Sequence, residues 1–228
     1  MRCLAALVLV VWASGAQAAC RLALVLAIDV SSSVDAQEHS LQRRGLAAAL
    51  TDKDVAAAML GGTGEVALAI FEWSGRRQQK IIQDWVLITS PADLEAVAAR
   101  VLRAGRSYTE FPTAMGYALG YAAGVLRDAP PCDRKVVDVS GDGVTNDGFR
   151  PQLAYEHFPF AGVTVNGLVV TGDDPRVVPY YQQEVLHGPR AFLEQADGYQ
   201  GFQEAMTRKL YRETEDLVLG QVVTRAPR

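Results

Sequence analysis

The most constraining feature of this chain is an uninterrupted apolar run that ends in a carboxylate. Residues 22–28, Leu-Ala-Leu-Val-Leu-Ala-Ile, are followed directly by Asp29. A short run of this kind, rich in branched side chains, is typical of a strand that is covered on both faces, as in a parallel sheet. We therefore predict a buried strand that delivers Asp29 to its carboxyl end.

Two serines follow Asp29 at alternate positions. If the backbone stays extended, Asp29, Ser31 and Ser33 face the same way, because side chains alternate along a strand. One carboxylate and two hydroxyls are hard oxygen donors, which suit Mg²⁺, Mn²⁺ or Ca²⁺, whereas zinc and copper prefer nitrogen and sulfur. This run predicts a site for a divalent cation.

Strand and helix signals alternate along the whole chain. Strands are predicted at 22–28, 65–73, 80–86, 135–140, 163–170 and 191–194, and helices at 35–50, 52–59, 90–103, 112–126, 151–157, 177–186 and 202–219. This alternation favours an α/β fold with a doubly wound, mostly parallel sheet in the order 3-2-1-4-5-6, one antiparallel strand on the edge side, and helices on both faces.

Ligands of such a sheet bind beyond the carboxyl ends of the strands, where the strand order reverses. Strands one and four are neighbours at that point, so Asp29 and Asp142 are expected side by side. The loop at 106–110 is expected at the same edge and can add a hydroxyl.

The first residues have the three parts of a secretory signal peptide. Arg2 gives a positive start, residues 4–12 are apolar, and residues 16–18 form a small-x-small cleavage site. We predict a signal peptide at 1–18, one domain at 19–219, a flexible tail at 220–228, and a periplasmic or secreted protein. The apolar run is too short to span a membrane, and no later segment comes closer.

Removal of a signal peptide leaves two cysteines, Cys20 and Cys132. Each starts a predicted strand, and the two strands are expected to be parallel neighbours, so the thiols would meet at the edge opposite the metal site. We predict a disulfide between them, with two unpaired thiols as the alternative. The formal net charge of −4 argues against nucleic acid and anionic membranes as partners.

The ordered set Asp29-x-Ser31-x-Ser33, then Thr109, then Asp142 resembles the metal-ion-dependent adhesion site of von Willebrand factor type A domains. In detail the chain resembles an exported bacterial branch that is described as a domain of unknown function, DUF1194. The runs that carry this second resemblance are 24–33, 137–143, 165–168 and 188–192.

The resemblance implies a cation that is ligated directly by Ser31, Ser33 and Thr109, while Asp29 and Asp142 hold it directly or through waters. It also implies an open coordination position, which an acidic side chain of a partner protein often fills. Thr109 is chosen because the family's threonine lies five residues before a small residue that opens the helix, here Ala114, and Thr113 is the alternative. The glycines usual before that threonine are replaced by residues 106–108.

These features predict a metal-dependent protein-binding module that is not an enzyme. The alternative is a hydrolase that uses the same cation as a Lewis acid, with Glu110 as the candidate base. A third possibility is that the cation only stabilises the fold. The histidines, His39, His157 and His187, lack mutual metal-ligand spacing and are interpreted as surface or cap residues.

Overall fold

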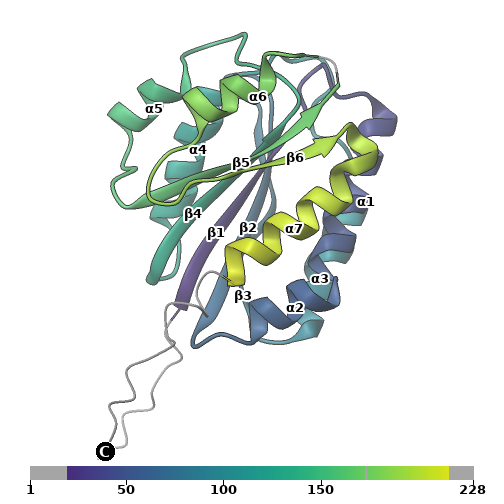
Figure 1. Ribbon diagram of the computed structural model, residues 1–228, viewed down its shortest axis with the longest axis vertical. Coiled ribbons are helices and arrows are strands. Elements are labelled where there is room, and N and C mark those ends of the chain that lie inside the picture. The colour runs from purple at the N-terminus through teal and green to yellow at the C-terminus, as the bar shows by residue number, and fades with distance from the viewer. Residues whose placement is uncertain (1–19, 173, 216–228) are drawn as a thin grey trace, which may run out of the picture.

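The computed structural model describes residues 20–172 and 174–215. Six strands form one sheet in the order β3-β2-β1-β4-β5-β6, so the predicted order is confirmed (Figure 1). The strands are β1 (Cys20–Asp29), β2 (Glu65–Trp73), β3 (Gln79–Ile88), β4 (Cys132–Gly141), β5 (Val163–Thr171) and β6 (Leu193–Asp197). Only the β2–β3 pair among them is antiparallel, also as predicted.

Helices cover both faces of the sheet (Figure 1). One layer contains α1 (Ala36–Leu50), α2 (Lys53–Leu60), α3 (Pro91–Arg103) and α7 (Phe202–Glu215). The other contains α4 (Met115–Arg127), α5 (Pro151–His157) and the short α6 (Val177–Tyr180), which continues into a π-helical turn, η1 (Tyr181–Val185). A 3₁₀ turn, η2 (Tyr199–Gly201), leads into α7.

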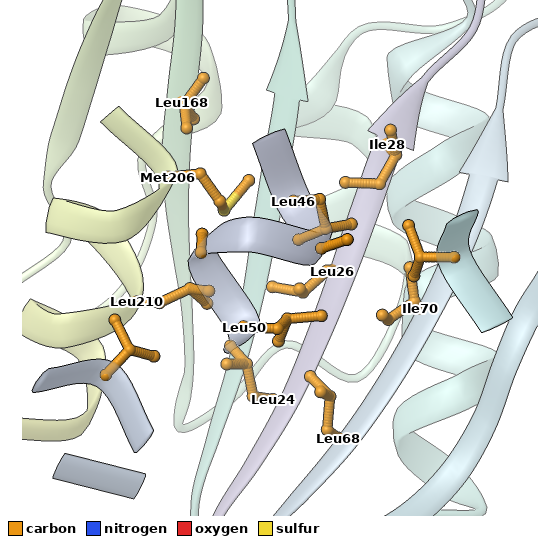
Figure 2. Close-up of a cluster of buried hydrophobic side chains, with 14 of the residues drawn as sticks. Leu24, Leu26, Ile28, Leu46, Leu50, Leu68, Ile70, Leu168, Met206 and Leu210 are labelled. Carbon is orange, nitrogen blue, oxygen red and sulfur yellow. The ribbon is translucent and has the colours of Figure 1, made fainter. Parts of the chain in front are cut away.

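The apolar run in β1 is explained by these two layers. Leu24, Leu26 and Ile28 belong to the core under α1 and α7 (Figure 2), whereas Val25 and Ala27 belong to the core under α4. All residues of β1 are buried. A strand with helices on both sides has no polar face, which is why period-2 alternation is absent from its sequence.

Two predicted helices differ from those observed. The helix predicted at 112–126 begins only at Met115, because the preceding loop is held by other segments: the Ala114 amide donates to the Ser74 carbonyl at 2.8 Å. The helix predicted at 177–186 changes to a π-turn at Tyr181, where the Leu186 amide donates to the Tyr181 carbonyl at 3.0 Å. The predicted start of α1 is confirmed by a capping box between Asp35 and Glu38.

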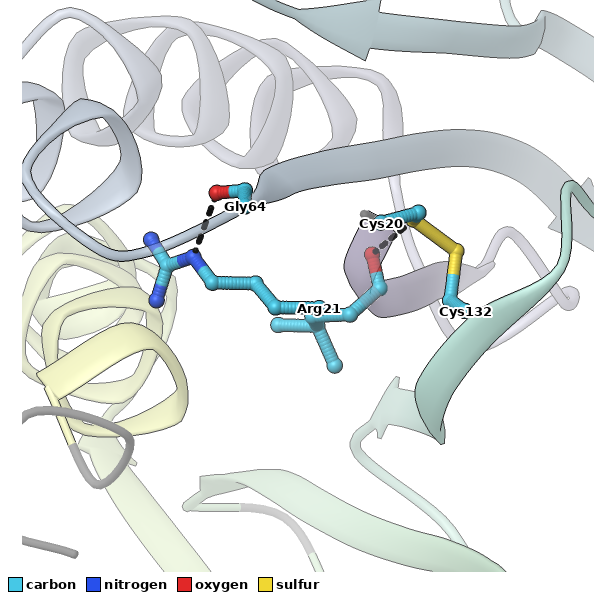
Figure 3. The surroundings of a disulfide bond; sticks show 5 residues. Cys20, Arg21, Gly64 and Cys132 are labelled. Atoms are coloured by element: carbon cyan, nitrogen blue, oxygen red, sulfur yellow. Dashed lines mark hydrogen bonds between the residues drawn. A yellow bond between two sulfur atoms is a disulfide. The ribbon is translucent and has the colours of Figure 1, made fainter. Parts of the chain in front are cut away.

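The predicted disulfide is confirmed at the amino ends of β1 and β4 (Figure 3). Cys20 and Cys132 are paired across the two strands, with Cα atoms 4.4 Å apart. The next residue, Arg21, is buried and donates to the carbonyls of Ala58, Met59, Gly64 and Thr214. This guanidinium therefore ties β1 to the ends of α2 and α7.

The predicted signal peptide at 1–18 and the tail at 220–228 lie outside the described residues. Within the described part of the chain, no helix has the length and apolar character needed to cross a bilayer.

Candidate metal centre

Asp29 ends β1 at the carboxyl edge of the sheet and is fully buried. Its Oδ1 accepts a hydrogen bond from the Ser31 amide at 2.7 Å, and its main-chain carbonyl accepts one from Gln42 of α1 at 3.1 Å. Its Oδ2 is also buried and has no hydrogen-bond partner among the described residues. One oxygen of Asp29 is thus held in place, and the other remains an acceptor without a donor.

The backbone after Asp29 is not extended, so our reason for the convergence of Asp29, Ser31 and Ser33 is wrong. A turn follows the strand, in which the Val34 amide donates to the Ser31 carbonyl at 3.0 Å. The turn still brings the two serines together, with hydroxyls that share a hydrogen bond at 3.2 Å. Their meeting is a property of this turn and not of strand alternation.

Hydroxyls and carboxylates from three loops form a continuous chain of oxygen atoms. The Thr113 hydroxyl donates to Ser31 Oγ at 3.2 Å, and the Ser33 hydroxyl donates to Asp142 Oδ1 at 2.8 Å. Asp142 follows β4 directly, so the neighbouring strands β1 and β4 each supply one carboxylate. The structure therefore brings Asp29, Ser31, Ser33 and Asp142 together.

Of the two candidate threonines, Thr113 lies against Ser31. Thr109 is exposed, whereas Thr113 is buried. The Thr113 amide donates to Asn146 Oδ1 at 2.9 Å, and its carbonyl accepts from the Asn146 amide at 3.0 Å. These bonds join the loop before α4 to the loop after β4, and they explain why α4 starts later than predicted.

The electrostatics of the site fit a cation. Burial, followed by the repulsion of Asp142, raises the pKa of Asp29 to about 8, although hydrogen bonds from Ser31 and the charge of Arg106 oppose this. Two carboxylates so close in a buried place repel each other unless a positive charge lies between them. The donors are hard oxygens, which suit Mg²⁺, Mn²⁺ or Ca²⁺. No cluster of three or more His, Cys, Asp or Glu side chains suited to a metal occurs among the described residues.

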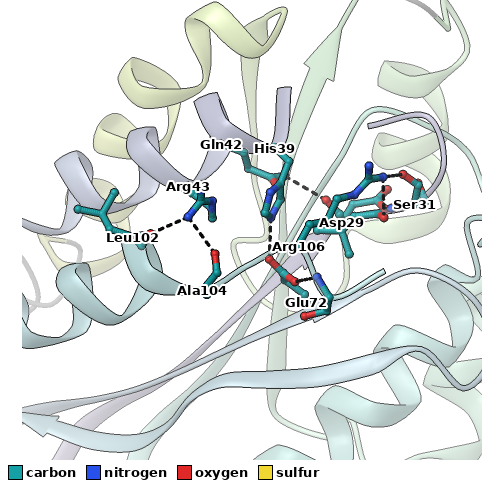
Figure 4. A network of polar contacts seen from close by, with 11 residues as sticks. Asp29, Ser31, His39, Gln42, Arg43, Glu72, Leu102, Ala104 and Arg106 are labelled. Atoms are coloured by element: carbon teal, nitrogen blue, oxygen red, sulfur yellow. Dashed lines mark hydrogen bonds and ion pairs between the residues drawn. The ribbon is translucent and has the colours of Figure 1, made fainter. Parts of the chain in front are cut away.

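A second layer of polar contacts supports the loop beside the site (Figure 4). His39 contacts Glu72 at 2.9 Å, and the Glu72 carboxylate accepts a hydrogen bond from the Ser107 amide at 2.9 Å. Arg106 then donates to the Ser31 carbonyl at 2.8 Å. Burial alone would raise the pKa of Glu72, but the hydrogen bonds from His39 and Ser107 lower it.

Our interpretation of His39 as a surface or cap residue is therefore wrong: it is buried and paired with Glu72. Sequence spacing did not show this pair, since its members are far apart in the chain. Two other carboxylates, on loops of the structure, form ion pairs with arginines: Asp147 with Arg76 at 2.7 Å, and Asp174 with Arg176 at 2.9 Å. Glu110 lies exposed on the loop before α4.

Two tyrosines near the carboxylates were missed as site residues. Tyr181 and Tyr199 are both buried, and their pKa values are raised by burial first and then by the charges of Asp29 and Asp142. No local pattern distinguishes such a residue from an ordinary core aromatic.

One family model, described as "Protein of unknown function (DUF1194)", matches residues 19–218. No curated protein matches the sequence significantly.

Solved structures with the same fold were also found. Proximal thread matrix protein 1 from the mussel byssus has 17% identity and a TM-score of 0.61, covering 89% of this chain and 49% of that one. The PilB minor pilin from Streptococcus sanguinis has 13% identity and a TM-score of 0.64, covering 91% and 64%. A von Willebrand factor type A protein from Catenulispora acidiphila has 16% identity and a TM-score of 0.57, covering 86% and 42%.

The mussel protein has also been solved with zinc in its metal-ion-dependent adhesion site (MIDAS) motif. That structure has 15% identity and a TM-score of 0.56, covering 89% of this chain and 49% of that one. The present chain thus spans between 42% and 64% of the length of these proteins. At such identities the likeness establishes the fold, which is that of a von Willebrand factor type A domain.

Proposed function

The chain belongs to the DUF1194 family and has the von Willebrand factor type A fold, and from this premise we propose that it is an exported protein-binding module that depends on a divalent cation. The observation that carries the proposal is the convergence of two carboxylates and three hydroxyls at the carboxyl edge of β1 and β4. Such a donor set has no evident role in packing, because it places buried polar atoms where apolar ones would cost less.

Five residues would hold the ion. Ser31, Ser33 and Thr113 would supply hydroxyl oxygens, and Asp29 and Asp142 would bind it directly or through waters. A bound Mg²⁺, Mn²⁺ or Ca²⁺ supplies a coordination position that accepts a carboxylate oxygen from outside the protein. Ser33 is exposed, whereas Asp29 is buried, so the site has a closed base and an accessible rim.

The partner would be a protein that offers an acidic side chain at this rim, and the location would be periplasmic or extracellular. The Cys20–Cys132 disulfide supports an oxidising compartment. Similar structures include a minor pilin and a byssal thread matrix protein, and this agrees with a role in binding other proteins.

Calorimetric titration of the purified protein with Mg²⁺, Mn²⁺ and Ca²⁺ tests cation binding. We expect wild type to bind one ion, and Asp142→Asn to weaken binding strongly because one of the two balancing charges is lost. Asp147→Asn is the matched control, since Asp147 lies in the same loop but binds Arg76. Absence of uptake by wild type at millimolar cation would refute the proposal.

Partner capture from a periplasmic extract tests the second half of the proposal. Recovery should be lost on chelation, return with Mg²⁺, and be absent for Asp142→Asn but present for Asp147→Asn. A hydrolase would instead be indicated if Glu110→Gln stopped turnover of a captured partner without reducing its capture. Chelation that lowers only the melting temperature would indicate a purely structural ion.

A further inference from the structure

Two buried tyrosines reach the metal centre from opposite sides of the sheet. Tyr181 packs in the core under α4 and α5, and Tyr199 packs in the core under α1 and α7. Their exposed fractions are 0% and 6%. Each helical layer therefore contributes one phenol to the carboxyl edge of β1 and β4.

The Tyr181 hydroxyl lies close to the unpartnered oxygen of Asp29. A Cβ atom on Gly141, at the end of β4, would be 2.7 Å from Asp29 Oδ2 and 2.8 Å from the Tyr181 hydroxyl. Both atoms thus approach the same point. The glycine leaves room there, and any larger residue would separate the phenol from the carboxylate.

The hydroxyls of both tyrosines are buried without a well-formed hydrogen bond among the described residues. The group that the Tyr199 hydroxyl approaches is Asp142. Leaving a buried hydroxyl unpaired costs about 1 to 3 kcal/mol. A tyrosine hydroxyl ordinarily loses its proton only at about pH 10, so at neutral pH each phenol is available as a hydrogen-bond donor. Two phenol hydroxyls that have donors to place therefore lie next to the carboxylates of Asp29 and Asp142.

Both tyrosines sit on irregular backbone. Tyr181 begins the π-turn η1, and Tyr199 begins the 3₁₀ turn η2 directly after Gly198, which has φ +57°. Insertions of the π type often occur at functional sites, because they redirect a side chain that a regular helix would place elsewhere. Plain packing of two aromatic rings does not require either departure.

We propose that Tyr181 and Tyr199 are positioning residues of the metal centre, whose hydroxyls hold the carboxylates of Asp29 and Asp142 in the ligating orientation by hydrogen bonds, direct or through one shared water. The inference rests on the proposed cation binding, because the orientation matters only if these carboxylates act as ligands. Groups that orient ligands in this way typically contribute about 10- to 100-fold to metal affinity.

Substitution by phenylalanine separates positioning from packing, since it removes the hydroxyl and keeps the ring. We expect Tyr181→Phe and Tyr199→Phe each to weaken Mg²⁺ or Mn²⁺ binding by about 10- to 100-fold in calorimetric titration. If the tyrosines only pack, both variants will bind the ion with wild-type affinity, and metal-free stability will rise because an unpaired hydroxyl has been removed.

Tyr155→Phe is the matched control. Tyr155 is also a partly buried phenol of the α4 and α5 layer, but its hydroxyl donates to the Val185 carbonyl. We expect this variant to unfold at lower temperature and to keep its cation affinity. Equal losses of affinity in all three variants would mean a general effect of lost hydroxyls, and would overturn the assignment.

A spectroscopic readout on wild type covers the case in which a variant does not fold. Addition of Mg²⁺ should perturb the ultraviolet absorption of the buried tyrosines, and an unchanged tyrosine spectrum in a protein that binds the ion would overturn the inference. Cation binding by wild type with unchanged affinity in both Phe variants overturns the positioning role alone. Absence of cation binding by wild type overturns the proposed function as well.

Discussion

We expect a buried ionic cluster between α7 and the sheet to make the stability of this protein depend on pH. Lys209 of α7 lies 2.7 Å from Asp138 of β4 and 3.4 Å from Glu213, and none of the three is more than 2% exposed. The Asn166 side-chain amide donates to Glu213. One lysine thus faces two carboxyl groups in a place without solvent.

Burial, and then the charge of Asp138, raises the pKa of Glu213 to about 8, although Lys209 opposes the shift. At neutral pH the carboxyl of Glu213 is therefore protonated in the folded protein, and Lys209 is balanced by Asp138 alone. In the unfolded chain the same group loses its proton above its ordinary pKa of 4.5.

The unfolding free energy falls as pH rises, because between pH 4.5 and about 8 the folded state binds more protons than the unfolded chain. The stabilising contribution is complete below pH 4.5 and declines as pH rises towards 8, because only the unfolded chain gains from ionisation. The expected slope is about 1.4 kcal/mol of unfolding free energy per pH unit. By pH 7 the accumulated loss is about 3 kcal/mol.

Glu213→Gln tests this reasoning, since glutamine keeps the shape and donor capacity of a protonated glutamate and cannot ionise. We expect wild type to lose stability between pH 5 and pH 8, by urea unfolding, more steeply than the variant by about 1.4 kcal/mol per pH unit. Comparison of the two proteins cancels the titration of Asp29, which both share. Glu204→Gln on the exposed side of α7 is the control. Parallel curves for wild type and Glu213→Gln would refute a protonated Glu213.

Two further predictions concern the scaffold. Cys20→Ser should lower the unfolding free energy by about 2 to 5 kcal/mol, because the disulfide joins residues 112 apart; an unchanged urea midpoint would contradict this. Gly116→Ala in α4 should destabilise by about 1 to 3 kcal/mol, since its methyl group would lie 2.1 Å from the Phe149 carbonyl oxygen. Gly124→Ala in the same helix, with no atom within 4 Å, should leave thermal stability equal or higher, and equal melting temperatures for both variants would argue against the close approach.

The sequence alone determined the sheet, its strand order and the carboxylates at its edge. Hydrophobic runs and strand-end residues are local patterns, and parallel strands bring their carboxyl ends to one edge whatever the loops do. The neighbouring positions of Asp29 and Asp142 follow from this rule, and the Cys20–Cys132 pair follows because the amino ends of the same two parallel strands also lie side by side.

Only the tertiary structure decided which loop residues join them. Bonds to Asn146, which lies in another loop, hold Thr113 against Ser31. The two serines meet through a turn that the apolar pattern does not reveal. The burial of His39 against Glu72 and the approach of Tyr181 to Asp29 likewise depend on segments distant in sequence. Contacts between loops leave no periodic pattern of residues in the sequence. Which loop residues meet is therefore known only once the helices and strands have packed.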